Sequence, residues 1–399
     1  MKRYVIIGNG VAGASAAEQI RKTDANGQID IFSRENHPFY YRPRLPEFLA
    51  GDVPVEKFTM HSLDKYKEWN INVHLADNIE YIDPSQKIVR SSKQGLIEYD
   101  SLLLANGASC NIPPLPGADK LGVFVLRTID DAKALQTAAQ HYKQAVLVGG
   151  GLLGLEAGFG LIKLGLQVKV VEFFDRLLPR QMDEQGAKVL QGLLEKKGFV
   201  FHLGARVKEI VGKDQAEAML LEDGACLPGG IILFSAGVHP NLELGKAIGL
   251  DIDKCIKVNA SMQTSIEGIY AAGDVAEFQG IPGGIWPIAL AQGKVAGSNM
   301  AGQEAAYIPK PPSMQLKVAG INLTSAGNID PDNLLTGLRM RQGDNYRKIV
   351  LQDDVIAGFI FLGDSEGVRQ CTDAMNQGRH LGELATEIGY PGFDFSQLD

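Results

Sequence analysis

The apolar residues of the chain form short runs, and two of these runs end in a glycine-rich turn. Residues 4–7 are apolar and precede glycines at 8, 10 and 13, whereas residues 145–148 are apolar and precede glycines at 149, 151 and 154. Apolar residues then recur at helical spacing over 11–22 and over 152–164. Each pattern predicts a buried strand, a tight turn and a helix.

A strand, a glycine turn and a helix in this order can bind a dinucleotide pyrophosphate, because backbone N–H groups and the positive end of the helix face the phosphates. Each turn also has an acidic residue about 20 residues further on, where a carboxylate accepts hydrogen bonds from an adenosine ribose. These residues are Glu35, after strand 28–33, and Glu172, after strand 168–171. One such motif is weak evidence. Two motifs predict a protein that holds two dinucleotides and moves a hydride or electrons between them.

Short strands are predicted over 71–107, and they end in Ala105-Asn106-Gly107. A proline-rich linker at 112–117 follows, because proline is excluded from a central strand. The unit that contains the second glycine turn is expected to end near residues 231–237. An apolar strand at 269–272 then runs into Gly273-Asp274, and a helix is predicted over 287–301.

The last part of the chain has a different pattern after a proline-rich break at 307–312. Apolar runs at 349–351 and 355–362 predict a β-hairpin, and a helix is predicted over 365–377. We therefore predict the fold class α/β, with two Rossmann-like units that suggest an internal duplication, followed by a small α+β domain.

Residues 37–46 combine aromatic, arginine and proline side chains. Such a segment is predicted to form a shaped loop without regular structure. A long loop beside a cofactor motif is often part of a site. The alternative is an exposed turn.

Composition and charge narrow the function classes. The chain has 399 residues, of which 45% are hydrophobic and 22% charged, as in globular proteins, and its net charge of −8 argues against nucleic-acid or anionic-membrane partners. No continuous stretch of apolar residues approaches the length of roughly 20 residues that is needed to span a bilayer. The first predicted strand begins almost at Met1, so we expect no signal peptide and a cytoplasmic protein. The four cysteines form no Cys-x-x-Cys pair and the histidines are scattered, so we expect reduced thiols and no metal site.

With both glycine turns, Ala105-Asn106-Gly107 and Ala272-Gly273-Asp274, nearly the whole chain resembles the two-dinucleotide-binding flavoprotein reductases. Within this family the resemblance is closest to NADH:rubredoxin reductases and the flavin domains of nitrite reductases, as the loop at 41–45 and the small C-terminal domain indicate. The resemblance implies that the first turn binds FAD and the second binds NADH. It also implies that the FAD domain is discontinuous, with the NAD domain inserted into it.

The domain boundaries follow from this resemblance and the two breaks. We expect the first part of the FAD-binding domain at 1–112, the NAD-binding domain at 113–238 and the second part of the FAD domain at 239–308. The α+β domain of rubredoxin-reductase type is expected at 309–399.

The resemblance and the motifs together imply two sets of contact residues. The FAD contacts are expected at Gly8, Gly10, Ala12, Gly13, Glu35, Arg42, Pro43, Ile79, Ala105, Gly107, Asp274 and Trp286. The NADH contacts are expected at Gly149, Gly151, Leu152, Leu153, Gly154, Glu172 and Gly237. Asp274 is expected to bind the ribityl chain, and Trp286 is either an aromatic beside the flavin or a core tryptophan.

The carboxylate of Glu172 repels a 2′-phosphate, so NADH is expected in preference to NADPH. Arg176, four residues on, is either a solvated arginine or a residue that weakens this preference.

The chain departs from the family pattern in three places. No cysteine precedes Cys110, although disulfide reductases of this superfamily need a cysteine pair shortly after the first turn. Electrons are therefore expected to leave from the flavin itself. Ferredoxin-reductase relatives pair a lysine after Arg-Pro with a glutamate after the second turn. The glutamate is Glu156, but the lysine position holds Glu47. Glu156 and Arg44 are the catalytic candidates, and Arg44 is expected to compensate for the missing cation. In addition, Asn106 stands where a threonine is usual.

These observations predict an FAD-dependent oxidoreductase that takes a hydride from NADH and passes electrons to a small carrier protein such as rubredoxin. Two alternatives stay open, namely an NADH oxidase that reduces oxygen and an NADH-sensing binding module. An acidic carrier is expected to dock on basic residues of the C-terminal part, namely Lys310, Lys317, Arg339, Arg341, Arg347 and Lys348. Scattered solvated charges are the alternative. The sequence leaves both a monomer and a homodimer open.

Overall fold

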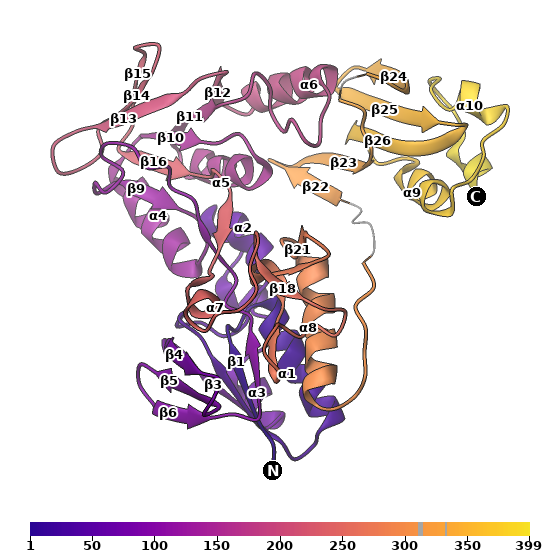
Figure 1. Ribbon diagram of the computed structural model, residues 1–399. Coiled ribbons are helices and arrows are strands. Elements are labelled where there is room, and N and C mark those ends of the chain that lie inside the picture. The colour runs from indigo at the N-terminus through magenta and orange to yellow at the C-terminus, as the bar shows by residue number, and fades with distance from the viewer. Residues whose placement is uncertain (310–313, 332) are drawn as a thin grey trace.

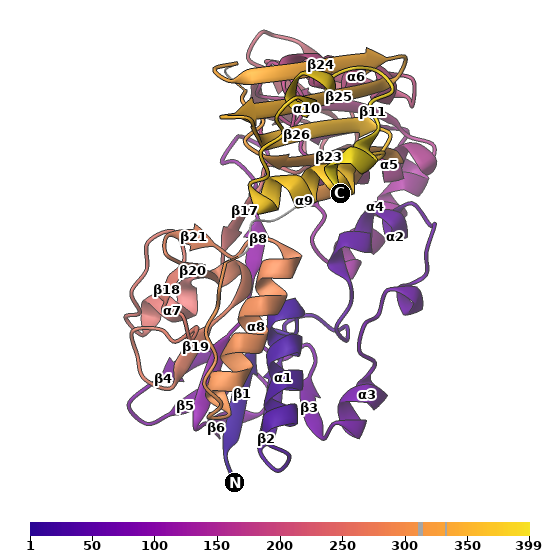
Figure 2. The same cartoon turned by 90° about the vertical axis from the view of Figure 1, so that its right-hand side faces the viewer.

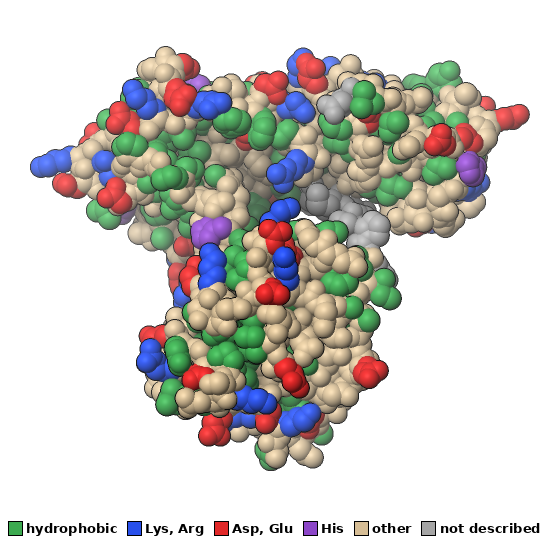
Figure 3. All heavy atoms as spheres, in the orientation of Figure 1, with side chains coloured by type: hydrophobic (Ala, Val, Ile, Leu, Met, Phe, Trp, Pro, Cys, Tyr) green, Lys and Arg blue, Asp and Glu red, His purple; other side chains and the backbone are tan. Residues whose placement is uncertain are grey.

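The computed structural model of the protein describes residues 1–309, 314–331 and 333–399, with only the backbone of 314–317. The chain forms three parts (Figure 1). Figure 3 shows a stem below a long bar: the first part is the stem, and the second and C-terminal parts form the bar. No helix in the described ranges is both long and apolar enough to cross a membrane.

The first part is built on a five-stranded parallel sheet in the order β19-β7-β1-β2-β3. Its strands, in chain order, are β1 (Arg3–Ile7), β2 (Gln28–Phe32), β3 (Ile71–His74), β7 (Ser101–Leu104) and β19 (Ile269–Ala271). The chain therefore returns to its first sheet after a long excursion. Between β3 and β7 it forms the antiparallel meander β4 (Ile79–Asp83), β5 (Ile88–Ser91) and β6 (Gly95–Glu98).

Helices α1 (Val11–Thr23) and α8 (Trp286–Met300) lie side by side on this sheet (Figure 2). Their close approach requires glycine, because a Cβ on Gly293 would lie 2.3 Å from the Ala12 carbonyl oxygen. Around this layer are α3 (Leu63–Glu68), α7 (Glu243–Ala247), β18 (Ile256–Val258), β20 (Ala276–Phe278), β21 (Ile281–Pro282) and the 3₁₀ turns η2 (Val55–Lys57) and η3 (Gly273–Val275).

The second part repeats the same plan. Its parallel sheet has the order β12-β11-β10-β16-β9 and is joined by a three-stranded antiparallel sheet, β13-β14-β15. The elements are β9 (Val123–Val125), α4 (Ile129–His141), β10 (Gln144–Val148), α5 (Leu152–Lys163), β11 (Gln167–Glu172), α6 (Glu184–Glu195), β12 (Phe199–Leu203), β13 (Val207–Val211), β14 (Ala218–Leu221), β15 (Cys226–Pro228) and β16 (Ile231–Phe234). Both glycine turns thus sit between the central strand of a parallel sheet and a helix.

Two short strands carry the chain between these parts. β8 (Ala108–Cys110) leaves the first part, β17 (Val238–Pro240) returns to it, and the two pair antiparallel. A further contact comes from α2 (Leu45–Leu49), which packs on α4 and α5.

The predicted loop at 37–46 is partly wrong, because it contains the 3₁₀ turn η1 (Arg42–Arg44) and the start of α2. Pro43 and Pro46 lie in the first turns of these helices. Proline is favoured there, because its missing N–H would have no partner in the helix.

The C-terminal part is a five-stranded antiparallel sheet in the order β22-β23-β26-β25-β24. The elements are β22 (Met314–Val318), β23 (Ile321–Gly327), β24 (Thr336–Gln342), β25 (Asn345–Gln352), β26 (Val355–Gly363), α9 (Val368–Gln377), α10 (Leu384–Glu387) and η4 (Phe395–Leu398). The predicted hairpin is present. The helix begins at Val368 rather than 365, because Gly367 has a φ of 86° and stands before its first turn.

The C-terminal sheet packs on the second part, beside α5 and α6 (Figure 1). Leu323, Tyr346 and Ile360 belong to the same apolar cluster as Leu147 and Leu190 of the second part. The fold class predicted from the sequence, two Rossmann-like units followed by a small α+β domain, is therefore confirmed.

Candidate functional site

A cavity of about 740 Å³ opens at the carboxyl ends of the first sheet and extends to the first turn of α5. Its walls include Gly10 of the first glycine turn, Asp274 after β19, and Leu153 at the start of α5. The volume is within the range of sites for organic ligands. The carboxyl ends of parallel strands are also where α/β folds bind nucleotides.

The first glycine turn combines two crowded positions with one open position. A Cβ on Gly8 would lie 2.2 Å from the Ala105 carbonyl oxygen, and a Cβ on Gly13 would lie 1.9 Å from that of Gly8. A Cβ on Gly10 would have no atom within 4 Å. Gly8 and Gly13 thus allow β1 and α1 to pack closely. Gly10 stands at the start of α1 with open space around it, so a ligand can approach its backbone. This accessible helix N-terminus fits a pyrophosphate.

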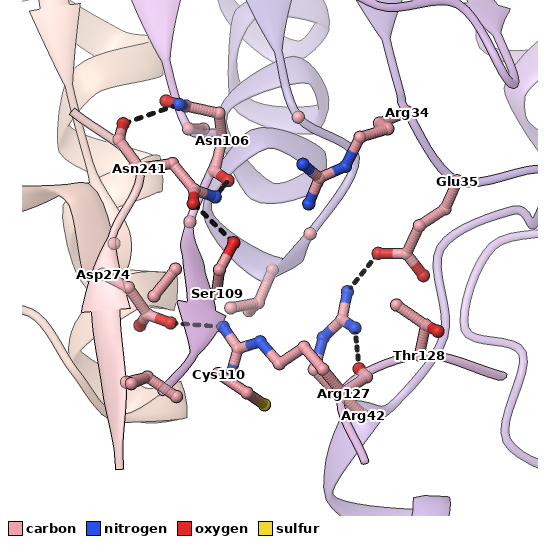
Figure 4. A pocket seen from close by; sticks show the side chains of 18 of the residues that line it. Arg34, Glu35, Arg42, Asn106, Ser109, Cys110, Arg127, Thr128, Asn241 and Asp274 are labelled. Carbon is pink, nitrogen blue, oxygen red and sulfur yellow. Dashed lines mark hydrogen bonds and ion pairs between the residues drawn. The ribbon is translucent and has the colours of Figure 1, made fainter. Parts of the chain in front are cut away.

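Two acid–arginine pairs lie next to each other in the cavity wall (Figure 4). The Arg42 Nη2 atom lies 2.7 Å from Glu35 Oε1, and the Arg127 Nη2 atom lies 2.6 Å from Asp274 Oδ2. Arg42 also donates to the Arg127 carbonyl, and the Tyr40 hydroxyl donates to Glu35 at 2.6 Å. These two ion pairs, with Arg34 also in the cavity wall, supply carboxylates and guanidiniums that match a ligand with both sugar hydroxyls and phosphates.

Burial and neighbouring charges fix the ionisation of this network. Burial alone would lower the pKa of Arg42, but Tyr40 and Glu35 raise it, so the guanidinium stays charged. Burial raises the pKa of Tyr40, so its hydroxyl stays a neutral donor.

Two asparagines connect the cavity wall to β8 and β17, the two strands that link the first and second parts (Figure 4). Asn106 Nδ2 donates to the Asn241 carbonyl at 2.8 Å, and Asn241 Nδ2 donates to the Asn106 carbonyl at 2.7 Å. The Ser109 hydroxyl donates to Asn241 Oδ1 at 2.7 Å. Asn106, which the resemblance marked as a departure, thus makes one half of a reciprocal pair.

The second glycine turn reproduces the first. A Cβ on Gly149 would lie 2.4 Å from the Ser235 carbonyl oxygen, and a Cβ on Gly154 would lie 2.6 Å from that of Gly149, whereas a Cβ on Gly151 would have no atom within 4 Å. Glu172 is buried beside this turn and accepts hydrogen bonds from the Gly150 N–H at 2.6 Å and the Phe174 N–H at 2.9 Å. A second bare helix end with a carboxylate beside it fits a second dinucleotide.

The residues expected from the sequence fall into three groups. Those that line the cavity are Gly8, Gly10, Ala12, Glu35, Arg42, Pro43, Ile79, Leu153, Ala105, Gly107, Gly237, Asp274 and Trp286. Gly13 lies behind the first turn. The residues of the second turn, beyond the cavity wall, are Gly149, Gly151, Leu152, Gly154 and Glu172.

The two catalytic candidates do not line the cavity. Arg44 Nε donates to Glu47 Oε2 at 2.8 Å, so the acid at the usual lysine position pairs with the arginine. Glu156 accepts a hydrogen bond from the Ala319 N–H at 2.6 Å, at the turn between β22 and β23. Their catalytic roles stay predictions.

Trp286 lies at the cavity wall within an aromatic group. Its ring stacks on Phe39 with centroids 5.7 Å apart and meets Tyr41 edge to face at 4.7 Å. Of these three rings only Trp286 lines the cavity, where it offers an aromatic contact to a ring system, while Phe39 and Tyr41 pack against it from outside the cavity wall.

Sequence reasoning missed Arg127 and Asn241 as site residues. Arg127 lies next to Thr128, the N-cap of α4, which forms a capping box with Asp131. The capping box was a local signal for the helix start. Nothing local indicated that the neighbouring arginine would reach Asp274.

The interpretation of the C-terminal basic residues as one docking patch is wrong for Arg347 and Lys348. Lys348 is fully buried and donates to the Ile329 and Asp330 carbonyls at 2.7 and 2.9 Å. Arg347 is 9% exposed and binds Asp364. Lys310 and the side chain of Lys317 lie outside the described residues.

Comparison with known proteins shows similarity along almost the whole chain. Residues 2–305 match the pyridine nucleotide-disulphide oxidoreductase family, and residues 312–379 match the rubredoxin NAD⁺ reductase C-terminal domain. An assimilatory nitrate reductase electron transfer subunit of Bacillus subtilis is 36% identical over 98% of the chain and 51% of its own length. The chain therefore spans about half the length of this relative.

An NADH-rubredoxin oxidoreductase of Clostridium acetobutylicum is 32% identical, and the match covers 91% of both chains. The crystal structure of NADH:rubredoxin oxidoreductase from the same organism superposes with a TM-score of 0.81 at 30% identity, over 95% of this chain and 96% of that one.

Proposed function

The chain belongs to the pyridine nucleotide-disulphide oxidoreductase family, as the two glycine turns predicted, and from this premise we propose its activity. It is an FAD-dependent oxidoreductase that takes a hydride from NADH and passes electrons to a small carrier protein such as rubredoxin. The main support for this proposal is one continuous cavity. It begins at the first glycine turn, which contains Gly10, and reaches α5, the helix that follows the second glycine turn with Gly151. Hydride transfer requires the two reacting rings to be in contact, and one shared cavity allows this contact.

The residues of the first part fit FAD. The Gly10 turn and the start of α1 would hold the pyrophosphate, with Arg42 and Arg127 supplying positive charge. Glu35 would accept hydrogen bonds from the adenosine ribose, and Asp274 from the ribityl chain. Trp286 would cover the ring system. When bound, FAD supplies the chemistry of accepting a hydride and releasing electrons.

The residues of the second turn fit NADH. The bare backbone at Gly151 would approach the pyrophosphate, and Glu172 would take the ribose hydroxyls. The same carboxylate repels a 2′-phosphate, so NADH is the preferred donor. Leu153 and Gly237 line the cavity between this turn and the FAD residues, on the path that the nicotinamide would follow.

The electron exit follows from the cysteines and the C-terminal part. Cys110 is the first cysteine of the sequence and the one that lines the cavity, and burial raises the pKa of its thiol, which disfavours the thiolate that a thiol relay requires. The match of residues 312–379 to the rubredoxin NAD⁺ reductase C-terminal domain supports a rubredoxin-like acceptor. We place the domain boundaries at 112, 238 and 308, where β8, β17 and the segment after α8 connect the three parts.

Anaerobic stopped-flow spectroscopy of the FAD-loaded protein tests this proposal. We expect NADH to bleach the flavin absorption within the turnover time, and rubredoxin to restore it at least ten times faster than air. Reoxidation by air at turnover rate would instead support an oxidase. Slow reduction with a long-lived charge-transfer band would support an NADH-sensing module. A protein that cannot be loaded with FAD would overturn the proposal.

A further inference from the structure

An exposed aromatic pair follows Glu172 directly. Phe173 and Phe174 are 55% and 52% exposed, and their rings meet edge to face with centroids 5.3 Å apart. The Arg206 guanidinium lies over the Phe173 ring, 4.6 Å from its centroid. Large apolar side chains gathered in water next to a binding turn mark a surface that a ligand or partner covers.

Backbone hydrogen bonds fix this pair beside the second glycine turn. The Phe174 N–H and the Gly150 N–H donate to the two oxygens of the same Glu172 carboxylate. The Phe174 carbonyl accepts a hydrogen bond from the Gly204 N–H at 2.8 Å, which holds the segment carrying Arg206 alongside. The two rings and the guanidinium therefore lie directly beside Glu172, the proposed contact of the ribose.

We propose that Phe173, Phe174 and Arg206 form the stacking platform for the adenine of NADH, an inference that rests on the proposed function. The adenosine ribose joins the pyrophosphate to the adenine. With the pyrophosphate at Gly151 and the ribose at Glu172, the adenine lies beyond Glu172, where the chain continues as Phe173. Aromatic rings and guanidinium groups both stack on the face of a purine. The adenine would thus be recognised by stacking against the face of its ring.

Calorimetric titration of ADP-ribose into the FAD-loaded protein tests this platform, because ADP-ribose carries the adenine and both phosphates but no nicotinamide. Stacking of one base on an aromatic side chain is worth about 1–3 kcal/mol, so we expect Phe173→Ala to weaken binding about ten-fold. The KM for NADH rises by a similar factor and kcat is unchanged. Reduced nicotinamide mononucleotide, which lacks adenine, keeps its kcat/KM.

Tyr81→Ala is the matched control. Tyr81 is 45% exposed and has the Arg90 guanidinium 5.7 Å from its ring centroid, but it lies on β4 of the first part. We expect this variant to bind ADP-ribose as the wild type does. Phe174→Ala and Arg206→Ala are each expected to weaken ADP-ribose binding less than Phe173→Ala.

Unchanged ADP-ribose affinity in both phenylalanine variants would overturn the platform, and a higher KM for the protein acceptor in the same variants would identify the pair as a docking surface. An equal loss of activity with reduced nicotinamide mononucleotide would also overturn it, because the effect would then not depend on adenine. A wild type that binds neither ADP-ribose nor NADH would overturn the proposed function itself.

Discussion

Asn106 and Asn241 exchange hydrogen bonds, each side-chain amide donating to the other residue's carbonyl at 2.8 and 2.7 Å. Asn106 precedes β8 and Asn241 follows β17, so the two residues flank the second part on either side. This reciprocal pair joins the two strands that enter and leave the second part, and it gives the Asn106 side chain a structural role.

Asn241→Ala should destabilise the protein by about 1–3 kcal/mol, because it leaves the Asn106 carbonyl and the Ser109 hydroxyl without these partners. Chemical denaturation of the purified protein measures this change. Asn26→Ala, at an exposed position, should leave the free energy of unfolding unchanged. An Asn241→Ala protein as stable as the wild type would contradict the role of the pair.

Gly10→Ala and Gly151→Ala should separate the two nucleotide sites. Each new Cβ has open space around it, so both variants should fold with an unchanged melting temperature of the cofactor-free protein. Gly10→Ala places a methyl group where the backbone would approach the FAD pyrophosphate, and we expect at least ten-fold weaker FAD binding. Gly151→Ala should keep FAD and raise the KM for NADH by a similar factor.

Flavin absorbance after gel filtration and steady-state kinetics measure these two effects. Gly13→Ala is the contrasting variant, because its Cβ would lie 1.9 Å from the Gly8 carbonyl oxygen and should prevent folding. Equal loss of FAD in both the Gly10 and Gly151 variants would contradict the assignment.

Glu172→Gln should reduce the preference for NADH over NADPH. The variant loses the negative charge that repels a 2′-phosphate and weakens charge-assisted hydrogen bonds, which are worth about 1.5–3 kcal/mol. We expect kcat/KM for NADH to fall about ten-fold or more, while the value for NADPH rises. Glu184→Gln removes an exposed charge nearby and should leave both values within two-fold. An unchanged ratio for Glu172→Gln would argue against its contact with the ribose.

Tyr346→Phe should weaken the contact between the second and C-terminal parts. The Tyr346 hydroxyl donates to the buried Asp183 carboxylate at 2.7 Å, and a hydrogen bond to a charged group contributes about 1.5–3 kcal/mol. Calorimetric melting should show this loss. Tyr390→Phe, at a residue that is 66% exposed, is the control and should melt as the wild type does.

The buried Asp183 carboxylate should also make the protein less stable in acid. Burial alone would raise the pKa of Asp183, but hydrogen bonds from Tyr346 and the Gly186 N–H and the charge of Lys348 hold it below its usual range. Because the folded-state pKa is the lower one, the contribution is complete above about pH 4, the ordinary value of an aspartate, and disappears as pH falls through the folded-state pKa. In Asp183→Asn, the free energy of unfolding should fall less over this interval. A parallel pH profile in both proteins would exclude Asp183 as the cause.

The glycine turns could be predicted from the sequence because they depend on local backbone needs. Gly8 and Gly149 have φ values of 111° and 109°, which only glycine adopts without strain, and a strand and a helix flank each. The strands and helices that flank both turns accordingly lie where they were expected, whereas α4 and α6 of the second part were not predicted. The prediction of an irregular loop at 37–46 is partly wrong because proline breaks a helix only in its interior, whereas Pro43 and Pro46 lie in the first turns of short helices.

Glu35, Arg42 and Asp274 could be named from the sequence, but the ion pairs of the site could not be predicted, because they depend on contacts between distant residues. Arg127 reaches Asp274 across 147 positions of sequence. Lys348 was expected at the surface, since lysine is almost never fully buried without partners. Its partners are two backbone carbonyls that lie near it only after β25 has joined the sheet.

The contact between the second and C-terminal parts has a mechanical consequence. The two parts share one apolar cluster and the buried Asp183 carboxylate, whereas the second part meets the first at the packing of α2, the Arg127–Asp274 ion pair and the narrow β8–β17 strand pair. Any rotation of the NADH-binding turn about that pair therefore carries the C-terminal sheet through the same angle. A carrier protein seated on that sheet would travel with the nicotinamide rather than with the flavin.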